Sequence, residues 1–337
     1  MNIFQYLGLP ELHRKLSNKV TQLVKHFAEV PDSRKKGKRY GIQLKKDGVC
    51  AITIVRDGVP AIYSRTGRRF TNTSKICHNI QALNLRDGVY FGELCCDLEH
   101  ISLEMLSGVV NPNRTAEVTE IHEAYDALDN MHMYFYDLIS IESFKKGTSN
   151  TDFQRRYNNL VERIYEPTNT TMREPENVSV VNLVPVETSQ IEHWLEVAVK
   201  NGEEGIVIID LDADWEAGHK GHRKMKLVRG VDYDLRCIGY EEGTGKYAGK
   251  VANLIFQWKD GKTIKAMLGK GWTHEMAEEM FHAIKRGESL GRNHGTKMSD
   301  PVGKIFQVVA LEESSKGKLR LPKVREQRHD KQTPDVG

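Results

Sequence analysis

The amino-acid sequence predicts an α+β fold, in which a mixed domain of sheets and helices is followed by a small β-barrel. Up to about residue 230, strand-like alternation of apolar residues is interspersed with amphipathic helical patterns. After that point the chain contains consecutive strand patterns separated by glycine-rich turns. The length of 337 residues suggests two domains at ~100–200 residues each. We therefore expect domains at residues 1–230 and 231–337.

The first domain is expected to alternate strands with helices. Apolar residues between Leu12 and Phe27 recur at helical spacing, which predicts a helix over residues 9–29. The pair Asp57-Gly58 between two alternating runs predicts a hairpin turn. We expect strands at residues 39–46, 49–57, 60–67, 88–95, 131–140, 205–210 and 223–228, and further helices at 117–129, 152–165 and 190–200.

The second domain is expected to be a small barrel. Residues 231–268 read as successive strands, and another strand is expected at residues 304–313. Between them lies a helix with Met276, Met280 and Ile284 on one face and Thr273 as its N-cap. About five strands and one helix are compatible with an OB-fold.

The charge distribution is informative although the net charge is only +3. Two basic stretches, residues 31–46 and 316–331, suggest a shared anionic partner, and the alternative is that both are solvated surface. The five cysteines lack a CxxC pair, which argues against a disulfide framework and a structural zinc site. No apolar run reaches the ~18 residues of a membrane span. The N-terminal residues do not resemble a secretory signal. We therefore expect a cytoplasmic protein without membrane segments.

Lys45 is the candidate nucleophile. It directly follows a predicted strand, in the sequence Lys45-Lys46-Asp47-Gly48, so rigid backbone holds its amine. A neighbouring cation or a metal ion can lower the pKa of such an amine and activate it. The alternative interpretation is an ordinary charged turn.

Two groups of basic residues suit phosphate binding. Arg65 and Arg68 flank a glycine turn, and forked guanidinium groups bind phosphate well. Lys224 and Lys226 share one face of a strand, where their charges repel unless an anion lies between them. The alternative for Arg65 and Arg68 is a solvated loop. The alternative for Lys224 and Lys226 is an edge strand whose lysines prevent pairing with another chain.

Two acids and one aromatic residue complete the candidate site. Glu93 lies within an apolar strand, where a carboxylate is costly unless it is paired or binds a metal ion. Glu204 precedes a buried strand and is placed to bind Mg²⁺. Tyr136 could stack on a nucleobase. The simpler alternatives are that Glu93 forms an ordinary salt bridge, that Glu204 only ends a helix, and that Tyr136 is part of the core. The chain lacks a GxxxxGK[ST] loop, so ATP would not be held by a P-loop.

The order of these motifs resembles one family. KKDG, SRTG, GEL, YFYDL, EEGIVI, KMK and RHDK stand in the order and strand context of covalent nucleotidyltransferases. The chain is similar to ATP-dependent DNA ligases, above all to the small two-domain enzymes of tailed bacteriophages. The resemblance covers about residues 38–331. It implies an ATP-grasp-like nucleotidyltransferase domain of antiparallel sheets and helices, followed by a C-terminal OB-fold.

The resemblance also implies a role for each candidate residue. Lys45 would be adenylated by ATP, with Mg²⁺ or Mn²⁺ bound near Glu93 and Glu204. Gln43 and the backbone of Leu44 would recognise adenine, Tyr136 would stack on it, and Glu93 would bind the ribose. Arg65 would contact phosphate, and Lys224 and Lys226 would bind the α-phosphate. Arg328 and Lys331 would orient the β- and γ-phosphates when the OB domain closes.

The implied partner is nicked double-stranded DNA, bound by a monomer. The residues that would contact the DNA backbone are Arg65, Arg68, Lys35, Lys36 and Lys38. One departure from the pattern concerns Cys50, because these ligases usually carry an arginine two residues after the glycine of KxDG. Arg68 or Lys46 could replace that arginine.

Three alternatives stay open at this stage. An RNA ligase or an mRNA-capping guanylyltransferase would use the same pocket, and a non-catalytic OB-containing nucleic-acid-binding protein would also explain the basic stretches. The C-terminal tail LRLP…RHDK and the long OB segment favour a DNA ligase over an RNA ligase.

Overall fold

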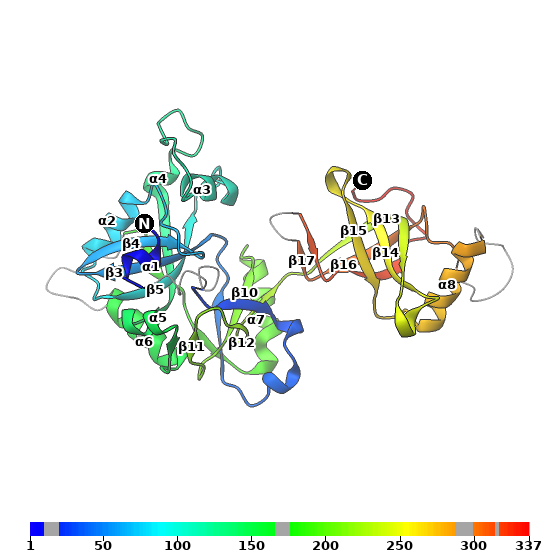
Figure 1. Cartoon of the computed structure of the whole chain (residues 1–337), viewed down its shortest axis with the longest axis horizontal. Coiled ribbons are helices and arrows are strands. Elements are labelled where there is room, and N and C mark those ends of the chain that lie inside the picture. Colours follow the sequence, from blue (N-terminus) through cyan, green and yellow to red (C-terminus); the bar gives the residue numbers. More distant parts are fainter. Residues whose placement is uncertain (10–19, 166–175, 287–298, 314–316, 337) are drawn as a thin grey trace. The chain divides into compact units, whose positions relative to one another are not determined.

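The computed structural model describes residues 1–9, 20–165, 176–286, 299–313 and 317–336. The chain forms two compact units, Met1–Leu227 and Val228–Gly337 (Figure 1). Within the described ranges, no helix is both long and apolar enough to cross a membrane.

Two five-stranded sheets form the framework of the first unit. One has the order β4-β3-β5-β6-β8, and the other has the order β1-β12-β10-β2-β9. The strands of the first sheet are β3 (Val49–Arg56), β4 (Val59–Ser64), β5 (Gly88–Cys96), β6 (Met131–Ile139) and β8 (Val178–Val180). Those of the second are β1 (Leu23–His26), β2 (Tyr40–Leu44), β9 (Val184–Val186), β10 (Gly205–Asp210) and β12 (Lys220–Val228). A separate pair joins β7 (Thr148–Ser149) to β11 (Trp215–Glu216).

The helices of the first unit cover these sheets. Residues Phe153, Leu160 and Ile164 recur on one face of α6 (Phe153–Tyr165) and are buried, and the helix packs against β6. In the same way α7 (Ile191–Lys200) packs against β10. The shorter helices are α1 (Ile3–Tyr6), α2 (Ser74–Ala82), α3 (Leu103–Val109), α4 (Ala127–Asn130) and α5 (Ile141–Lys146). Three-residue 3₁₀ turns occur at Phe27–Glu29, Asp32–Arg34 and Thr188–Gln190.

One predicted helix of this unit is wrong over residues 20–29, and another is much shorter than predicted. Residues 10–19 of the first lie outside the described part of the chain, and its remainder forms β1 and a 3₁₀ turn. Leu23 and Val24 pair in parallel with β12, and this tertiary pairing overrides their helical spacing. The helix expected over 117–129 is reduced to α4, because the segment is folded into single turns such as that from Thr119 to His122.

The second unit is a closed barrel with the strand order β13-β14-β15-β19-β16, as the sequence predicts. Its strands are β13 (Val231–Glu242), β14 (Val251–Gln257), β15 (Thr263–Leu268), β16 (Ile305–Ala310) and β19 (Lys323–Gln327). A minor pair joins β17 (Glu312–Glu313) to β18 (Leu319–Arg320), and 3₁₀ turns lie at Gly245–Tyr247 and Lys259–Gly261. Parallel pairing of β15 with β19 completes the ring.

One helix, α8 (His274–Arg286), packs on the barrel against β14. Its N-terminus is capped as expected, because the Thr273 hydroxyl accepts a hydrogen bond from the Met276 amide at 3.1 Å. Met280 on its inner face joins a core that includes Leu254, Phe256 and Phe306. The fold class predicted from the sequence is therefore confirmed.

Candidate functional site

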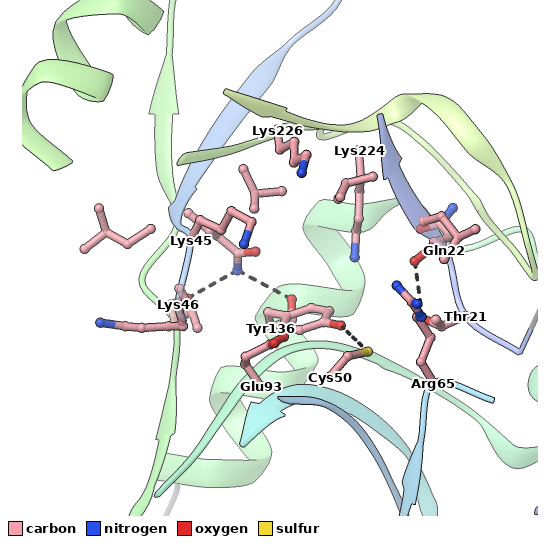
Figure 2. A pocket seen from close by; sticks show the side chains of 16 residues that line it. Thr21, Gln22, Lys45, Lys46, Cys50, Arg65, Glu93, Tyr136, Lys224 and Lys226 are labelled. Atoms are coloured by element: carbon pink, nitrogen blue, oxygen red, sulfur yellow. Dashed lines mark hydrogen bonds between the residues drawn. The ribbon is translucent and has the colours of Figure 1, made fainter. Parts of the chain in front are cut away.

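Both sheets of the first unit contribute to one cleft of about 280 Å³ (Figure 2). This volume is close to the lower end, ~300 Å³, of pockets that hold small ligands. Eight of the residues predicted to bind ATP or react with it line the cleft: Gln43, Leu44, Lys45, Arg65, Glu93, Tyr136, Lys224 and Lys226. In Figure 2, the side chains of Lys45, Lys224 and Arg65 enter the cleft from different sides.

Lys45 lies at the end of β2, where its backbone is fixed to β10. Its amide donates a hydrogen bond to the carbonyl of Gly205 at 2.9 Å, and its amine forms an ion pair with Glu204. Glu204, which does not line the cleft wall itself, is thus brought directly to Lys45. The neighbouring Lys46 also lines the cleft, and its amine pairs with Glu203 at 2.6 Å (Figure 2).

Gly48 lets the turn after Lys45 pack closely against β5. A Cβ atom at this position would lie 2.7 Å from the carbonyl oxygen of Leu94 and 2.8 Å from the side chain of Glu93. Any larger residue would push the turn away, since backbone atoms cannot yield at such distances. The glycine therefore fixes the proximity of Lys45 to Glu93.

Glu93 is a half-buried acid whose pKa is raised. Burial raises its pKa to about 7, although the positive charge of Lys45 acts in the opposite direction. The negative charges of Glu204 and Asp47 add to the upward shift. The side chain therefore exchanges a proton near neutral pH, where a bound cation would favour its ionised form.

The carboxylates of Glu93 and Glu204 both interact with the charge of Lys45. Among the described residues, no group of three or more His, Cys, Asp or Glu side chains is placed to hold a metal ion. Mg²⁺ commonly binds through one or two carboxylates together with water and substrate phosphates. Glu93 and Glu204 fit that kind of site, in which a phosphorylated substrate supplies the remaining ligands.

A β-bulge places Tyr136 in the cleft. Gly92 lies opposite Phe135 and Phe91 lies opposite Asp137, so Tyr136 is an extra residue in β6. The consecutive residues Tyr136 and Asp137 consequently both contact Lys224. The Lys224 amine lies 5.0 Å from the centre of the Tyr136 ring and 2.8 Å from Oδ2 of Asp137.

Beneath the cleft, Asp137 holds two cations. Lys224 donates to Oδ2 at 2.8 Å, and the Arg156 guanidinium donates to Oδ1 at 2.8 Å and to Oδ2 at 3.2 Å. All three side chains are buried. Burial alone would raise the pKa of Asp137, but the charges of Arg156 and Lys224 lower it. Two positive charges against one negative charge leave an excess of one, which an anion in the cleft would balance.

Cys50 forms part of the cleft wall where the resemblance implies an arginine. Its Sγ lies 4.0 Å from the hydroxyl of Tyr136, and it is paired with Glu93 across the strands. Burial raises the pKa of the Cys50 thiol to about 12, so this group is neutral at physiological pH. Arg65 is the nearby arginine that lines the cleft.

The proposed DNA-binding residues Arg68, Lys35, Lys36 and Lys38 do not line the cleft. Arg68 donates to the side chain of Asn113 at 3.0 Å. Lys35 pairs with Asp32 at 2.7 Å and is largely buried against the ring of Phe27, whereas Lys36 is exposed. Lys38 pairs with the buried Asp210 at 2.8 Å. Arg328 and Lys331 belong to the second unit, where both pair with Asp234.

Several residues of the cleft were not anticipated. Thr21 and Gln22 precede β1 and are buried, and they were hidden by the helix predicted over residues 9–29. Apolar wall positions come from Leu23, Val24, Val181 and Val207. Arg156 was also missed, although its place on the apolar face of α6, three residues after Phe153, was a usable signal.

We predict that Glu93→Gln makes stability less dependent on pH. Because the folded pKa of about 7 exceeds the ordinary glutamate pKa of 4.5, wild-type stability falls as pH rises through this interval. The glutamine variant lacks that loss and should gain up to about 3 kcal/mol at pH 8. Urea denaturation at pH 5 and pH 8 measures the difference. The exposed Glu196→Gln serves as the control, and an unchanged pH dependence in Glu93→Gln would contradict the prediction.

We also predict that Asp137→Asn is strongly destabilising. It leaves Arg156 and Lys224 buried without a counter-charge, which costs about 3–5 kcal/mol. The exposed pair between Arg39 and Asp212 provides a matched control, and Asp212→Asn should change the free energy of unfolding little. Equal effects of the two substitutions in urea denaturation would show that the Asp137 ion pairs do not support the fold.

Comparison with known protein families covers both units. A family model described as "ATP dependent DNA ligase domain" matches residues 18–227, and one described as "DNA ligase OB-like domain" matches residues 242–328. A "Probable DNA ligase" from Anaeromyxobacter sp. (strain K) is 35% identical over 97 residues, which are 28% of this chain and 19% of that protein. Another from Anaeromyxobacter sp. (strain Fw109-5) is 29% identical over 175 residues, 48% of this chain and 33% of the relative. The matches thus span a fifth to a third of these relatives' length.

Solved structures share the fold. The structure described as "Pmar-Lig_PreS3" has a TM-score of 0.60 at 20% identity, covering 91% of this chain and 67% of that one. A second, described as "DNA binding with a minimal scaffold: Structure-function analysis of Lig E DNA ligases", has a TM-score of 0.53 at 16% identity, covering 91% and 98%. The first family model alone matches more than half of the sequence, and the chain therefore belongs to the ATP-dependent DNA ligase family.

Proposed function

We propose that this protein is an ATP-dependent DNA ligase that seals nicks in duplex DNA through a lysyl-AMP intermediate. The observation that carries the proposal is the position of Lys45 in the cleft. Its amine is anchored at a strand end, beside two acids and in one cavity with Arg65, Lys224 and Lys226. A nucleophile next to a group of cations suits attack on a phosphate.

In the first step, the Lys45 amine attacks the α-phosphorus of ATP. A P–N bond forms, the bond to the β-phosphate oxygen breaks, and pyrophosphate leaves. Glu204 must release Lys45, whose amine has to lose a proton before it attacks. Lys224 and Lys226 bind the α-phosphate, Tyr136 stacks on adenine, and Gln43 and the backbone of Leu44 read its edge. Arg328 and Lys331 orient the pyrophosphate portion.

A divalent ion, Mg²⁺ or Mn²⁺, held by Glu93 and Glu204 would neutralise phosphate charge during this chemistry. Glu93 also binds the ribose, and Arg65 contacts phosphate. These roles require Glu93 in its ionised form, which bound cations favour even though burial raises its pKa.

Two further transfers complete the reaction. The 5′-phosphate at the nick attacks lysyl-AMP, so that Lys45 is regained and the DNA end carries AMP. The 3′-hydroxyl then attacks the activated 5′-phosphate and expels AMP, which leaves a phosphodiester bond. We expect a monomer in the cytoplasm with functional domains 1–230 and 231–337, and DNA contacts directed to the phosphate backbone by Arg65, Arg68 and Lys36.

Lys45→Ala should abolish covalent labelling of the protein by ATP, because only a primary amine at this position can form the P–N bond. Lys46→Ala is the matched control and should retain labelling at a reduced rate, since Lys46 lines the same cleft and supplies a neighbouring positive charge but not the reacting amine. Labelling from radioactive ATP and GTP, followed by denaturing gels, provides the measurement. Wild-type labelling of Lys45→Ala, or labelling by GTP alone, would refute the proposal.

DNA affinity should depend on salt partly through Lys36. A lysine that contacts one phosphate contributes ~0.9 to the slope of log K against log salt. We expect Lys36→Ala to reduce the slope for nicked duplex by about that amount. Lys35→Ala should change it less, because Lys35 is already paired with Asp32 and covers Phe27. An unchanged slope for Lys36→Ala would exclude this segment from the DNA contact.

A further inference from the structure

Arg328 and Lys331 are surrounded by carboxylates within the second unit. The Arg328 guanidinium donates two hydrogen bonds to Asp330, at 2.9 and 2.7 Å, and one to Oδ2 of Asp234 at 2.8 Å. Lys331 pairs with the same Asp234 carboxylate and with Asp335 at 3.2 Å. We call these five residues the tail cluster: Asp234, Arg328, Asp330, Lys331 and Asp335.

The tail cluster is built into the barrel. Asp234 lies on β13 and is only 4% exposed. Its amide donates to Oδ2 of Asp335 at 2.7 Å, and the Asp335 amide donates to the Asp234 carbonyl at 2.8 Å. This exchange extends the pairing of β13 to the C-terminal residues. The carboxylates are therefore held in position around the two cations.

The charges of the tail cluster do not favour anion binding. Three carboxylates and two cations sum to one negative charge. Asp232 and Arg236 occupy the same face of β13 and add one charge of each sign. Hydrogen bonds from Arg328 lower the pKa of Asp330 to about 2, and the Asp234 amide lowers that of Asp335. Asp330 and Asp335 are therefore ionised at neutral pH, and a phosphate group that approaches this arrangement meets net repulsion.

We propose that Asp234 and Asp335 act as an inhibitory clamp on Arg328 and Lys331, which the triphosphate of ATP must displace. The inference rests on the proposed function, in which those two cations bind the β- and γ-phosphates. Phosphate and carboxylate compete for the same N–H donors, so the clamp weakens ATP binding before lysyl-AMP forms. It has no effect on later steps, in which no pyrophosphate group takes part.

Asp335 is the part of the clamp that can be altered without disturbing the core. An asparagine at this position retains an oxygen that can accept the Asp234 amide, and it removes one negative charge. Replacing Asp234 is less informative, because this residue is buried and its Oδ1 has no hydrogen-bond partner among the described residues. The control is Glu278→Gln on α8, which removes the same charge from the exposed pair of Glu278 with Lys250.

The first test measures lysyl-AMP formation as a function of ATP concentration at low salt. Asp335→Asn should lower the KM for ATP about twofold to fivefold, the range of an exposed charge pair, and Glu278→Gln should not. Sealing of a nick with a pre-adenylated 5′ end should proceed at the wild-type rate in both variants. A raised or unchanged KM in Asp335→Asn would overturn the clamp, since the acid would then position Lys331 or do nothing.

The second test measures pyrophosphate binding by calorimetry in full-length protein carrying Lys45→Ala, where no covalent step can occur. Adding Asp335→Asn should tighten pyrophosphate binding by a similar factor, and adding Glu278→Gln should not. Equal affinities would overturn the clamp. Because this readout needs no catalysis, tighter pyrophosphate binding together with a failure of ATP to label the protein that retains Lys45 would refute the proposed ligase function and leave the clamp standing.

Discussion

The first unit depends on the charge at Asp137. Its carboxylate holds Arg156 of α6 and Lys224 of β12 in the interior, so one residue of β6 ties a helix and both sheets together. Such a cluster is costly to bury, and its net positive charge is balanced only when an anion arrives. The same interaction therefore ties the fold together and leaves an excess positive charge at the cleft.

The two units use charge in opposite ways. In the cleft, Lys224 belongs to a group with an excess of positive charge, whereas the cations of the tail cluster are outnumbered by carboxylates. Both arrangements stabilise the protein in the absence of a nucleotide. They differ in what a phosphate finds there, because the first attracts it and the second must rearrange.

Much of the fold and many of the cleft residues could be predicted from the sequence. Alternating residues indicated β2 to β6, β10 and β12, and the apolar face of α6 was evident from its spacing. The cleft gathers residues from motifs far apart in the chain, because each motif ends or begins a strand. Three features could not be foreseen. The apolar residues of the parallel strand β1 have a spacing that also fits a helix. The ion-pair partner of Arg156 is Asp137, which lies 19 residues away in the sequence. The bulge at Tyr136 depends on the pairing register between β5 and β6.

The bulge in β6 has a consequence for how this sequence can change during evolution. Substitutions at Tyr136 alter only what faces the ligand, because the backbone register persists. Deletion of either Tyr136 or Asp137 would restore regular alternation and remove one of the two contacts that this strand makes with Lys224. The segment should therefore tolerate exchange of the side chain at Tyr136, but neither the loss of Asp137 nor a change of length.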